Sequence, residues 1–247
     1  MRIKGILFDK DGTLIDFDRT WGPAAYETMR TLANGDRRKL ERVMAVSLYD
    51  ETTRSFSPDS PMVGGSSAEY GPLWAEALGR PAGPELYGEM DELLRFWGLE
   101  SLSPICEPAS LLTRLSDEGY RLGIATNDAE GSAEAQADAM GLTPLLDYLA
   151  GYDSGFGSKP GPGMVSAFAA RCGFRPGEVV MIGDSIHDLA AARAAGAVAL
   201  GVLTGPLGAE ARTTILPYAD DIIPSIADLP EWLGRFEAPN SLERAVA

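Results

Sequence analysis

Four short apolar runs recur along the chain, and each ends abruptly in a group of polar residues. Their brevity and unbroken hydrophobic character predict β-strands that are buried on both faces. The expected strands are Ile6–Phe8, Tyr120–Ala125, Glu178–Ile182 and Ala197–Leu203.

Between these runs lie stretches with helical patterning. Leu111, Leu112 and Leu115 share one face of a stretch that begins at Pro108, and glycines stand where the later stretches end. The expected helices cover residues 108–118, 129–140, 162–172 and 188–195, and a last short strand and helix are expected within 221–233. Alternating strands and helices predict an α/β fold with a Rossmann-like parallel sheet, in which the polar strand ends gather at one ligand-binding edge.

Residues 16–103 break this alternation. Their apolar spacing predicts helices over 24–33, 37–49, 73–78 and 85–97, separated by segments rich in proline and glycine. A helical segment inserted directly after the first strand lies beside the ligand edge and is expected to form a cap. We therefore expect a discontinuous core of residues 1–15 and 104–236, a cap of residues 16–103, and a loosely held tail of residues 237–247.

The charge balance restricts the possible partners. The 247 residues include 21 Lys and Arg against 36 Asp and Glu, a net charge of −15. Such a chain lacks the basic footprint that nucleic-acid binding needs, and a small anion would need local positive charge. The two cysteines, Cys106 and Cys172, lie far apart, and no apolar stretch is long enough for a membrane span. A cytoplasmic protein without nucleic-acid or membrane partners is expected.

The first apolar run ends in two aspartates, Asp9 and Asp11, two residues apart. Side chains alternate along a strand, so these two carboxylates can enter the same space. Their repulsion costs free energy unless a cation or a shared proton relieves it. The pair therefore predicts a metal site, an acid/base role, or both.

Four motifs in order resemble those of the haloacid-dehalogenase-like superfamily of phosphatases. Each motif is weak alone, but each lies at an expected strand end or helix start. They are Asp9-Lys10-Asp11-Gly12-Thr13, Thr126-Asn127, Lys159-Pro160 and Gly183-Asp184-Ser185-Ile186-His187-Asp188. The position and helical content of the insert resemble the C1-type cap found in phosphoglycolate phosphatases and β-phosphoglucomutases.

The resemblance implies a division of roles around Mg²⁺. Asp9 would be the nucleophile that forms an aspartyl-phosphate, and Asp11 would protonate the leaving group and then activate water. The metal would be held by the Asp9 and Asp184 carboxylates and by the backbone carbonyl of Asp11. Asp188 would lie in its second shell, bind it weakly, or orient Lys159.

The resemblance also implies an anion-binding half of the site. Thr126 and the backbone of Asn127 would hold phosphate oxygens, while Lys159 adds positive charge. Each residue has an ordinary structural alternative: Asp184 as a helix N-cap, for example, or Lys159 as a surface lysine. Four matched motifs in order favour the functional interpretation. His187 falls at a variable position of its motif and is expected at an exposed helix start.

Asp11 separates branches of the superfamily, because a departing halide needs no proton whereas an alcohol does. A small phosphate monoester such as phosphoglycolate is the expected substrate, and Arg54 is a candidate to pair with a second anionic group. Two alternatives remain: a sugar-phosphate mutase like β-phosphoglucomutase, and a catalytically silent binding module. The partner in either enzymatic case is a small anionic metabolite, and the oligomeric state is left open.

Overall fold

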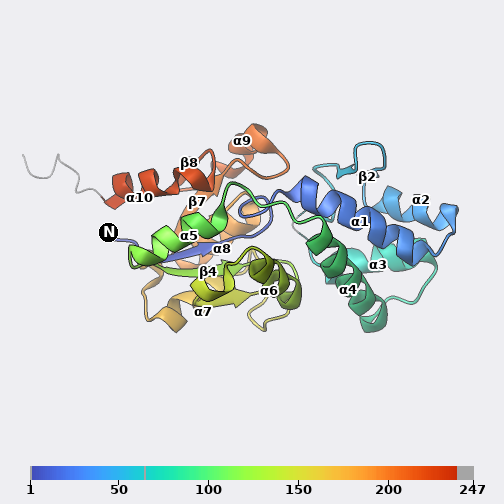
Figure 1. Ribbon diagram of the computed structural model, residues 1–247, viewed down its shortest axis with the longest axis horizontal. Coiled ribbons are helices and arrows are strands. Elements are labelled where there is room, and N and C mark those ends of the chain that lie inside the picture. Colours follow the sequence, from blue (N-terminus) through green and yellow to red (C-terminus); the bar gives the residue numbers. More distant parts are fainter. Residues whose placement is uncertain (1, 64, 238–247) are drawn as a thin grey trace, which may run out of the picture.

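The computed structural model describes residues 2–63 and 65–237 and shows an α/β fold. Its centre is a parallel six-stranded sheet in the order β5-β4-β1-β6-β7-β8 (Figure 1). The strands are β1 (Gly5–Phe8), β4 (Arg121–Ala125), β5 (Tyr148–Ala150), β6 (Val179–Gly183), β7 (Val198–Val202) and β8 (Asp221–Ile223). The predicted Rossmann-like parallel sheet is confirmed.

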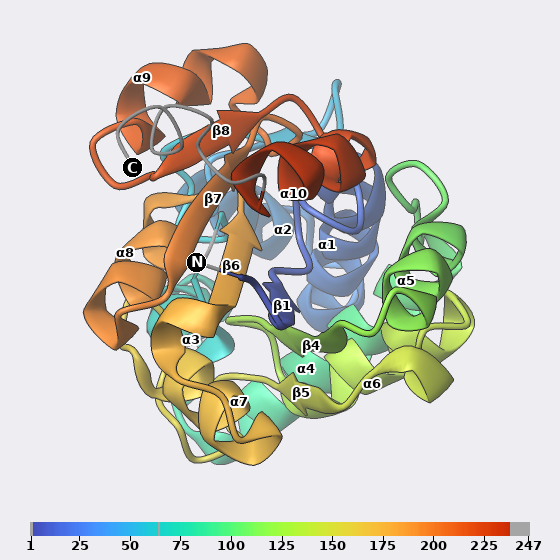
Figure 2. The same cartoon turned by 90° about the vertical axis from the view of Figure 1, so that its left-hand side faces the viewer.

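Helices cover both faces of the sheet because side chains alternate along each strand (Figure 2). Ile6 and Phe8 pack into one apolar core, whereas Leu7 between them packs into the other. The first core is closed by α5 (Pro108–Asp117), α6 (Glu130–Ala139) and α10 (Leu229–Glu237). The second is closed by α7 (Gly163–Cys172), α8 (Ile186–Ala195) and α9 (Ala211–Ile215).

Two elements of the core were not predicted. Strand β5 has three residues and α9 has five, which is too short for a recognisable hydrophobic period. The other core elements lie within a few residues of the expected bounds. Helix α8, for example, begins at Ile186 rather than Asp188, because the Ser185 side chain accepts the backbone N–H of Asp188 and caps the helix two residues earlier.

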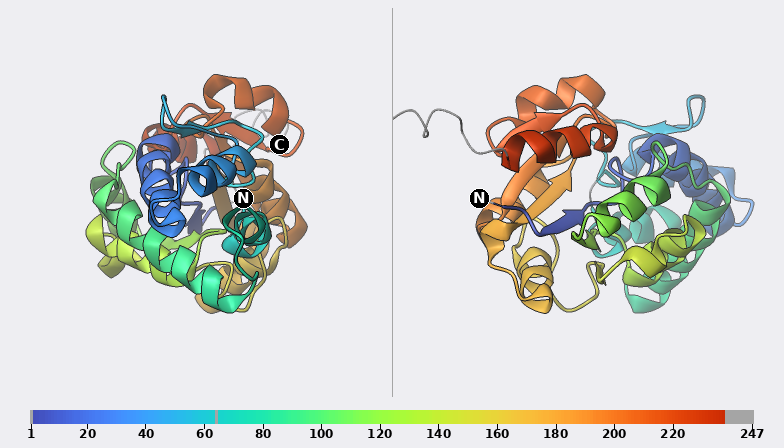
Figure 3. Two further views of the ribbon diagram at one scale, coloured as in Figure 1. Left: turned by 90° about the vertical axis from the view of Figure 1, so that its right-hand side faces the viewer. Right: turned by 60° about the vertical axis from the view of Figure 1, so that its left-hand side comes forward.

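The insert between β1 and β4 forms its own layer beyond the carboxyl ends of the strands (Figure 3). It contains α1 (Phe17–Ala33), α2 (Arg37–Val46), α3 (Ser67–Leu78) and α4 (Pro84–Glu100), which share a separate apolar core. A short hairpin of β2 (Tyr49–Asp50) and β3 (Ser55–Phe56) was not expected. We call residues 17–100 the helical insert.

Helices α1 and α3 begin well before the predicted starts because capping side chains precede them. The Asp16 side chain accepts the backbone N–H of Arg19 and starts α1 at Phe17, with Gly22 and Pro23 accommodated inside the helix. Glu69 accepts the backbone N–H of Ser66 ahead of α3. Residues 238–247 of the expected tail lie outside the described residues, and no helix of the described chain has the length and hydropathy of a membrane span.

Candidate active site

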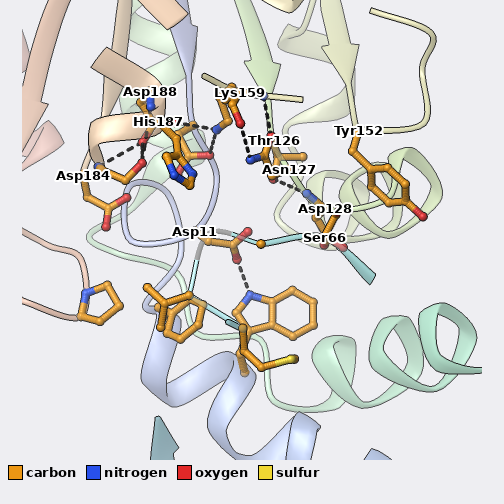
Figure 4. A pocket seen from close by; sticks show the side chains of 18 of the residues that line it. Asp11, Ser66, Thr126, Asn127, Asp128, Tyr152, Lys159, Asp184, His187 and Asp188 are labelled. Atoms are coloured by element: carbon orange, nitrogen blue, oxygen red, sulfur yellow. Dashed lines mark hydrogen bonds and ion pairs between the residues drawn. The ribbon is translucent and has the colours of Figure 1, made fainter. Parts of the chain in front are cut away.

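Three neighbouring strands deliver the predicted residues to one edge of the sheet. Asp9 follows β1, Thr126 and Asn127 follow β4, and Asp184 follows β6. Because β4, β1 and β6 are adjacent and parallel, their carboxyl ends meet (Figure 4). Lys159 reaches the same place from the loop between β5 and α7.

Lys159 is the cation at the centre of this cluster and is 4% exposed. Its Nζ lies 2.5 Å from Asp9 Oδ1, 2.6 Å from Asp188 Oδ1 and 2.8 Å from the carbonyl oxygen of Ala125. Asn127 fixes its backbone, since the Asn127 amide donates to the Lys159 carbonyl at 3.0 Å and accepts its N–H at 2.8 Å. Burial opposes the charged form of Lys159, but Asp188 and Asp9 outweigh it and raise its pKa.

Three carboxylates, those of Asp9, Asp184 and Asp188, offer oxygen atoms within 4.8 Å of one another. Burial first, and then the charge of Asp188, raises the pKa of Asp9 to about 7. Burial and the charges of Asp9 and Asp188 raise the pKa of Asp184 well above its usual value. One lysine therefore does not balance the cluster, and its hard oxygen ligands fit a divalent cation such as Mg²⁺.

The turn after β1 is tight enough to require glycine. Gly12 has a φ of +76°, in the left-handed region that L-residues rarely adopt. A Cβ atom there would also lie 2.7 Å from the Asp184 carboxyl group, which is shorter than any ordinary contact. Gly12 thus lets the chain turn away while the first and fourth motifs stay in contact.

Asp188 links the fourth motif to Lys159. Its Oδ2 accepts the Ser185 N–H at 3.1 Å and the Ser185 hydroxyl at 2.6 Å, while its Oδ1 faces Lys159. Of the predicted roles, this geometry supports orientation of Lys159, and the carboxyl group also lies within reach of a metal held by Asp9 and Asp184.

The side chain of Asp11 is held away from that cluster by residues that the sequence did not reveal. Lys10 is fully buried, and its Nζ lies 2.8 Å from the Asp11 carboxylate and 3.3 Å from that of Asp128. The indole N–H of Trp21, on α1, donates to Asp11 Oδ1 (Figure 4). The Lys10 ammonium also lies 4.9 Å from the centroid of the Trp21 ring. The Asp11 carboxylate is therefore contacted both by Lys10 at the sheet edge and by Trp21 of the helical insert.

A cavity of about 250 Å³ lies between the sheet edge and the helical insert. Its sheet side includes the predicted Asp9, Asp11, Thr126, Asn127, Lys159, Asp184 and Asp188. Its insert side includes Trp21, Tyr70 and Asp91, which no sequence motif marked. These residues enter the site only because the insert is docked on the core.

Two residues weighed from the sequence have clear positions. Arg54 lies outside the residues that line the cavity; its guanidinium lies 5.0 Å from the Tyr26 ring centroid, and its φ is +53°. The structure therefore gives no support to the predicted contact between Arg54 and the substrate. His187 is exposed, as expected, and it is also among the residues that line the cavity.

Family comparison agrees with this geometry. The model of the haloacid dehalogenase-like hydrolases matches residues 3–196. The chain belongs to the haloacid dehalogenase-like hydrolases. The predicted family and the expectation of an enzyme are confirmed, and the four motifs lie where the hydrolase fold brings them together.

Two relatives of this hydrolase match almost all of it. Phosphoglycolate phosphatase of Rhodospirillum rubrum is 28% identical over 239 residues, covering 94% of this chain and 91% of the relative. Pyrophosphatase PpaX of Bacillus pumilus is 25% identical over 238 residues, covering 94% of this chain and 97% of that relative.

Solved structures share the fold of this hydrolase. A family hydrolase from Deinococcus radiodurans with bound phosphate and sodium has a TM-score of 0.63 at 21% identity, over 94% of this chain and 96% of that one. A Thermotoga maritima protein predicted to be a β-phosphoglucomutase has a TM-score of 0.65 at 20% identity, over 94% of this chain and 99% of that one.

Proposed function

We propose that this hydrolase is a Mg²⁺-dependent phosphatase that cleaves a small phosphate monoester through an aspartyl-phosphate. The observation that carries the proposal is the 2.5 Å contact between Asp9 and Lys159 at the end of the central strand, with Asp11 facing the same cavity. The phosphatase names of the relatives support the same class of reaction. The helical insert would act as a C1-type cap over this site.

Asp9 is the proposed nucleophile. Its carboxylate oxygen forms the new bond to phosphorus while the bond from phosphorus to the alcohol oxygen breaks. Lys159 holds that carboxylate by an ion pair and adds positive charge beside the transferred group. Thr126 Oγ1, which accepts the Asp128 N–H at 3.1 Å, can donate its own hydrogen to a phosphate oxygen. The Asn127 backbone is the proposed second donor.

Asp11 is the proposed proton carrier. In its protonated form it gives a proton to the departing alcohol oxygen, and the resulting carboxylate then takes a proton from the water that attacks the aspartyl-phosphate. Phosphate leaves, Asp9 is regenerated and Asp11 is protonated again, so the cycle closes. Lys10 and Trp21 limit where this carboxyl group can move.

Asp9, Asp184 and the backbone carbonyl of Asp11 would hold Mg²⁺, with Asp188 as a further or outer ligand. The fit rests on three clustered carboxylates that a single lysine leaves unbalanced. The bound cation would supply charge neutralisation to the transferred phosphoryl group and to the carboxylates themselves.

Phosphate release from p-nitrophenyl phosphate in the presence of Mg²⁺ tests the proposal. Asp9→Asn should reduce turnover to background, because the amide is not a nucleophile, whereas Asp117→Asn on the exposed end of α5 should match the parent protein. Asp11→Asn should slow turnover and leave a phosphorylated protein detectable as an added phosphoryl mass. Full activity of Asp9→Asn would refute the proposed nucleophile.

A sugar-phosphate mutase is the second candidate, because the Thermotoga maritima neighbour shares the whole fold. Such an enzyme would convert β-glucose 1-phosphate to β-glucose 6-phosphate without net phosphate release. Phosphate and product measured in the same reaction separate the two activities. If Mg²⁺-loaded protein turns over no phosphate ester at all, a silent binding module becomes the better interpretation.

A further inference from the structure

We propose that the alcohol portion of the substrate carries no negative charge and presents hydroxyl or amine hydrogens to the helical insert. This inference rests on the proposed phosphatase function and names its substrate class. It departs from phosphoglycolate and pyrophosphate, whose second group is an anion.

The insert side of the cavity is apolar and acidic. Aromatic and aliphatic side chains make up most of it: Phe17, Trp21, Met62, Val63, Tyr70 and Leu94. Its polar members are Ser66, Ser67 and Asp91. Among the described residues that line the cavity, none from the insert is a lysine or an arginine, and the only residue of this loop without a description is Gly64. A second anion would therefore meet no counter-charge from the insert.

The cations near the cavity are already paired. Lys159 contacts Asp9 and Asp188, and Lys10 contacts Asp11 and Asp128. Among the described residues that line the cavity, His187 is the remaining basic side chain, but it belongs to the sheet side and is exposed at the start of α8. Figure 4 shows it beside Asp184, on the opposite side of Asp11 from the helical insert. Among the described residues of the insert that line the cavity, none would meet a carboxylate with positive charge.

The cavity wall does offer hydrogen-bond acceptors, which are carboxylate oxygens. Asp91 is half-buried on α4, and the Tyr152 hydroxyl lies 3.3 Å from its Oδ2 and 3.1 Å from Ser67 Oγ. Asp128 lines the neighbouring wall. An ionised carboxylate only accepts hydrogen bonds, so the ligand group that contacts Asp91 must donate one. A carboxylate ligand would lose its hydration next to like charges, which selects against it.

Matched esters test this inference. 2-Hydroxyethyl phosphate differs from phosphoglycolate only in carrying a hydroxymethyl group in place of the carboxylate, and 2-aminoethyl phosphate carries a cation instead. At pH 8 with saturating Mg²⁺, we expect kcat/KM for the hydroxyl and amine esters to exceed that for phosphoglycolate at least tenfold. Equal or better use of phosphoglycolate would overturn the inference.

Two variants locate the selection. Asp91→Asn removes a negative charge with little change of shape, so the preference against phosphoglycolate should shrink at least threefold. Glu92→Gln, the next residue on the same helix but exposed, should leave the preference unchanged. An undiminished preference in Asp91→Asn, with unaltered thermal stability, would show that the insert does not select by charge.

The same assays distinguish a failure of the proposed phosphatase function from a failure of the proposed substrate class. If p-nitrophenyl phosphate and all three esters release no phosphate, both the phosphatase assignment and the substrate class are wrong. If p-nitrophenyl phosphate is cleaved and phosphoglycolate is the best of the three esters, only the substrate class is wrong. His187→Gln adds a check: a loss of phosphoglycolate turnover confined to this ester would show that His187 binds its carboxylate.

Discussion

Lys10→Met tests the most unexpected contact of the site. The substitution keeps a long apolar side chain but removes the ammonium group that lies 2.8 Å from Asp11 and 3.3 Å from Asp128. Those two carboxylates would then share a cavity wall without a counter-charge between them. Both stability and catalysis should suffer, for separate physical reasons.

The magnitude follows from burial. Lys10 is fully buried, whereas the side chains of Asp11 and Asp128 are 20% and 22% exposed, so water relieves part of the repulsion. We therefore take the lower end of the cost of breaking a buried pair, about 3 kcal/mol of unfolding free energy. Without the Lys10 contact the Asp11 carboxyl group can move, and a displacement of about 1 Å is enough to lower kcat by about 100-fold.

Urea unfolding and steady-state phosphate release measure the two effects. Lys4→Met is the matched control, because Lys4 precedes the same strand and pairs with Glu178 at 2.9 Å but is half exposed. The control should lose less than about 1 kcal/mol and retain its kcat. If Lys10→Met keeps kcat within threefold while its KM rises instead, Lys10 acts on substrate binding and the positioning argument is refuted.

Three further predictions concern the metal and the insert. Trp21→Phe should lower kcat about fivefold, because it removes the N–H donor to Asp11, worth about 1 kcal/mol, but keeps a ring beside Lys10; unchanged kcat would contradict the contact. In metal-free protein the pKa of Asp9 is raised to about 7, so folded protein binds more protons than unfolded protein and loses stability as pH rises from about 4 to 7. The rise in Tm on adding Mg²⁺ should therefore be larger at pH 8 than at pH 5, and Asp184→Asn should abolish most of it; an equal rise at both pH values would count against the site. Tyr152→Phe should speed amide hydrogen exchange in α3 and α4, because it removes the hydroxyl that contacts both Ser67 and Asp91. Unaltered exchange would show that Tyr152 does not hold the insert.

Local pattern was enough to predict most of the core and the members of the cluster of carboxylates around Lys159. Strands buried on both faces appear in the sequence as short apolar runs, and the residue after each run lies at the carboxyl edge of a parallel sheet. That reasoning is enough to place Asp9, Thr126 and Asp184 at one edge of the sheet. It failed for β5 and α9, whose few residues leave no measurable period.

The surroundings of Asp11 could not be predicted in the same way. Lys10 and Asp11 are neighbours in the sequence, but the partner Asp128 comes from the loop after β4 and Trp21 from the insert. Arg54 shows the reverse error: its position in the sequence favoured the site, yet its side chain lies over Tyr26. Such contacts depend on how the insert packs on the sheet edge.

Strand periodicity is local, and strand ends converge in every fold of this type. The amino-acid pattern was therefore enough to predict the family, the parallel sheet and the carboxylate and lysine residues at its carboxyl edge. The residues that face that edge depend on how the insert packs on the core. Docking of the insert brings an apolar and acidic wall over the carboxylates and Lys159, through contacts between residues far apart in the chain. That wall, rather than the motifs, supports an uncharged or cationic alcohol as the leaving group.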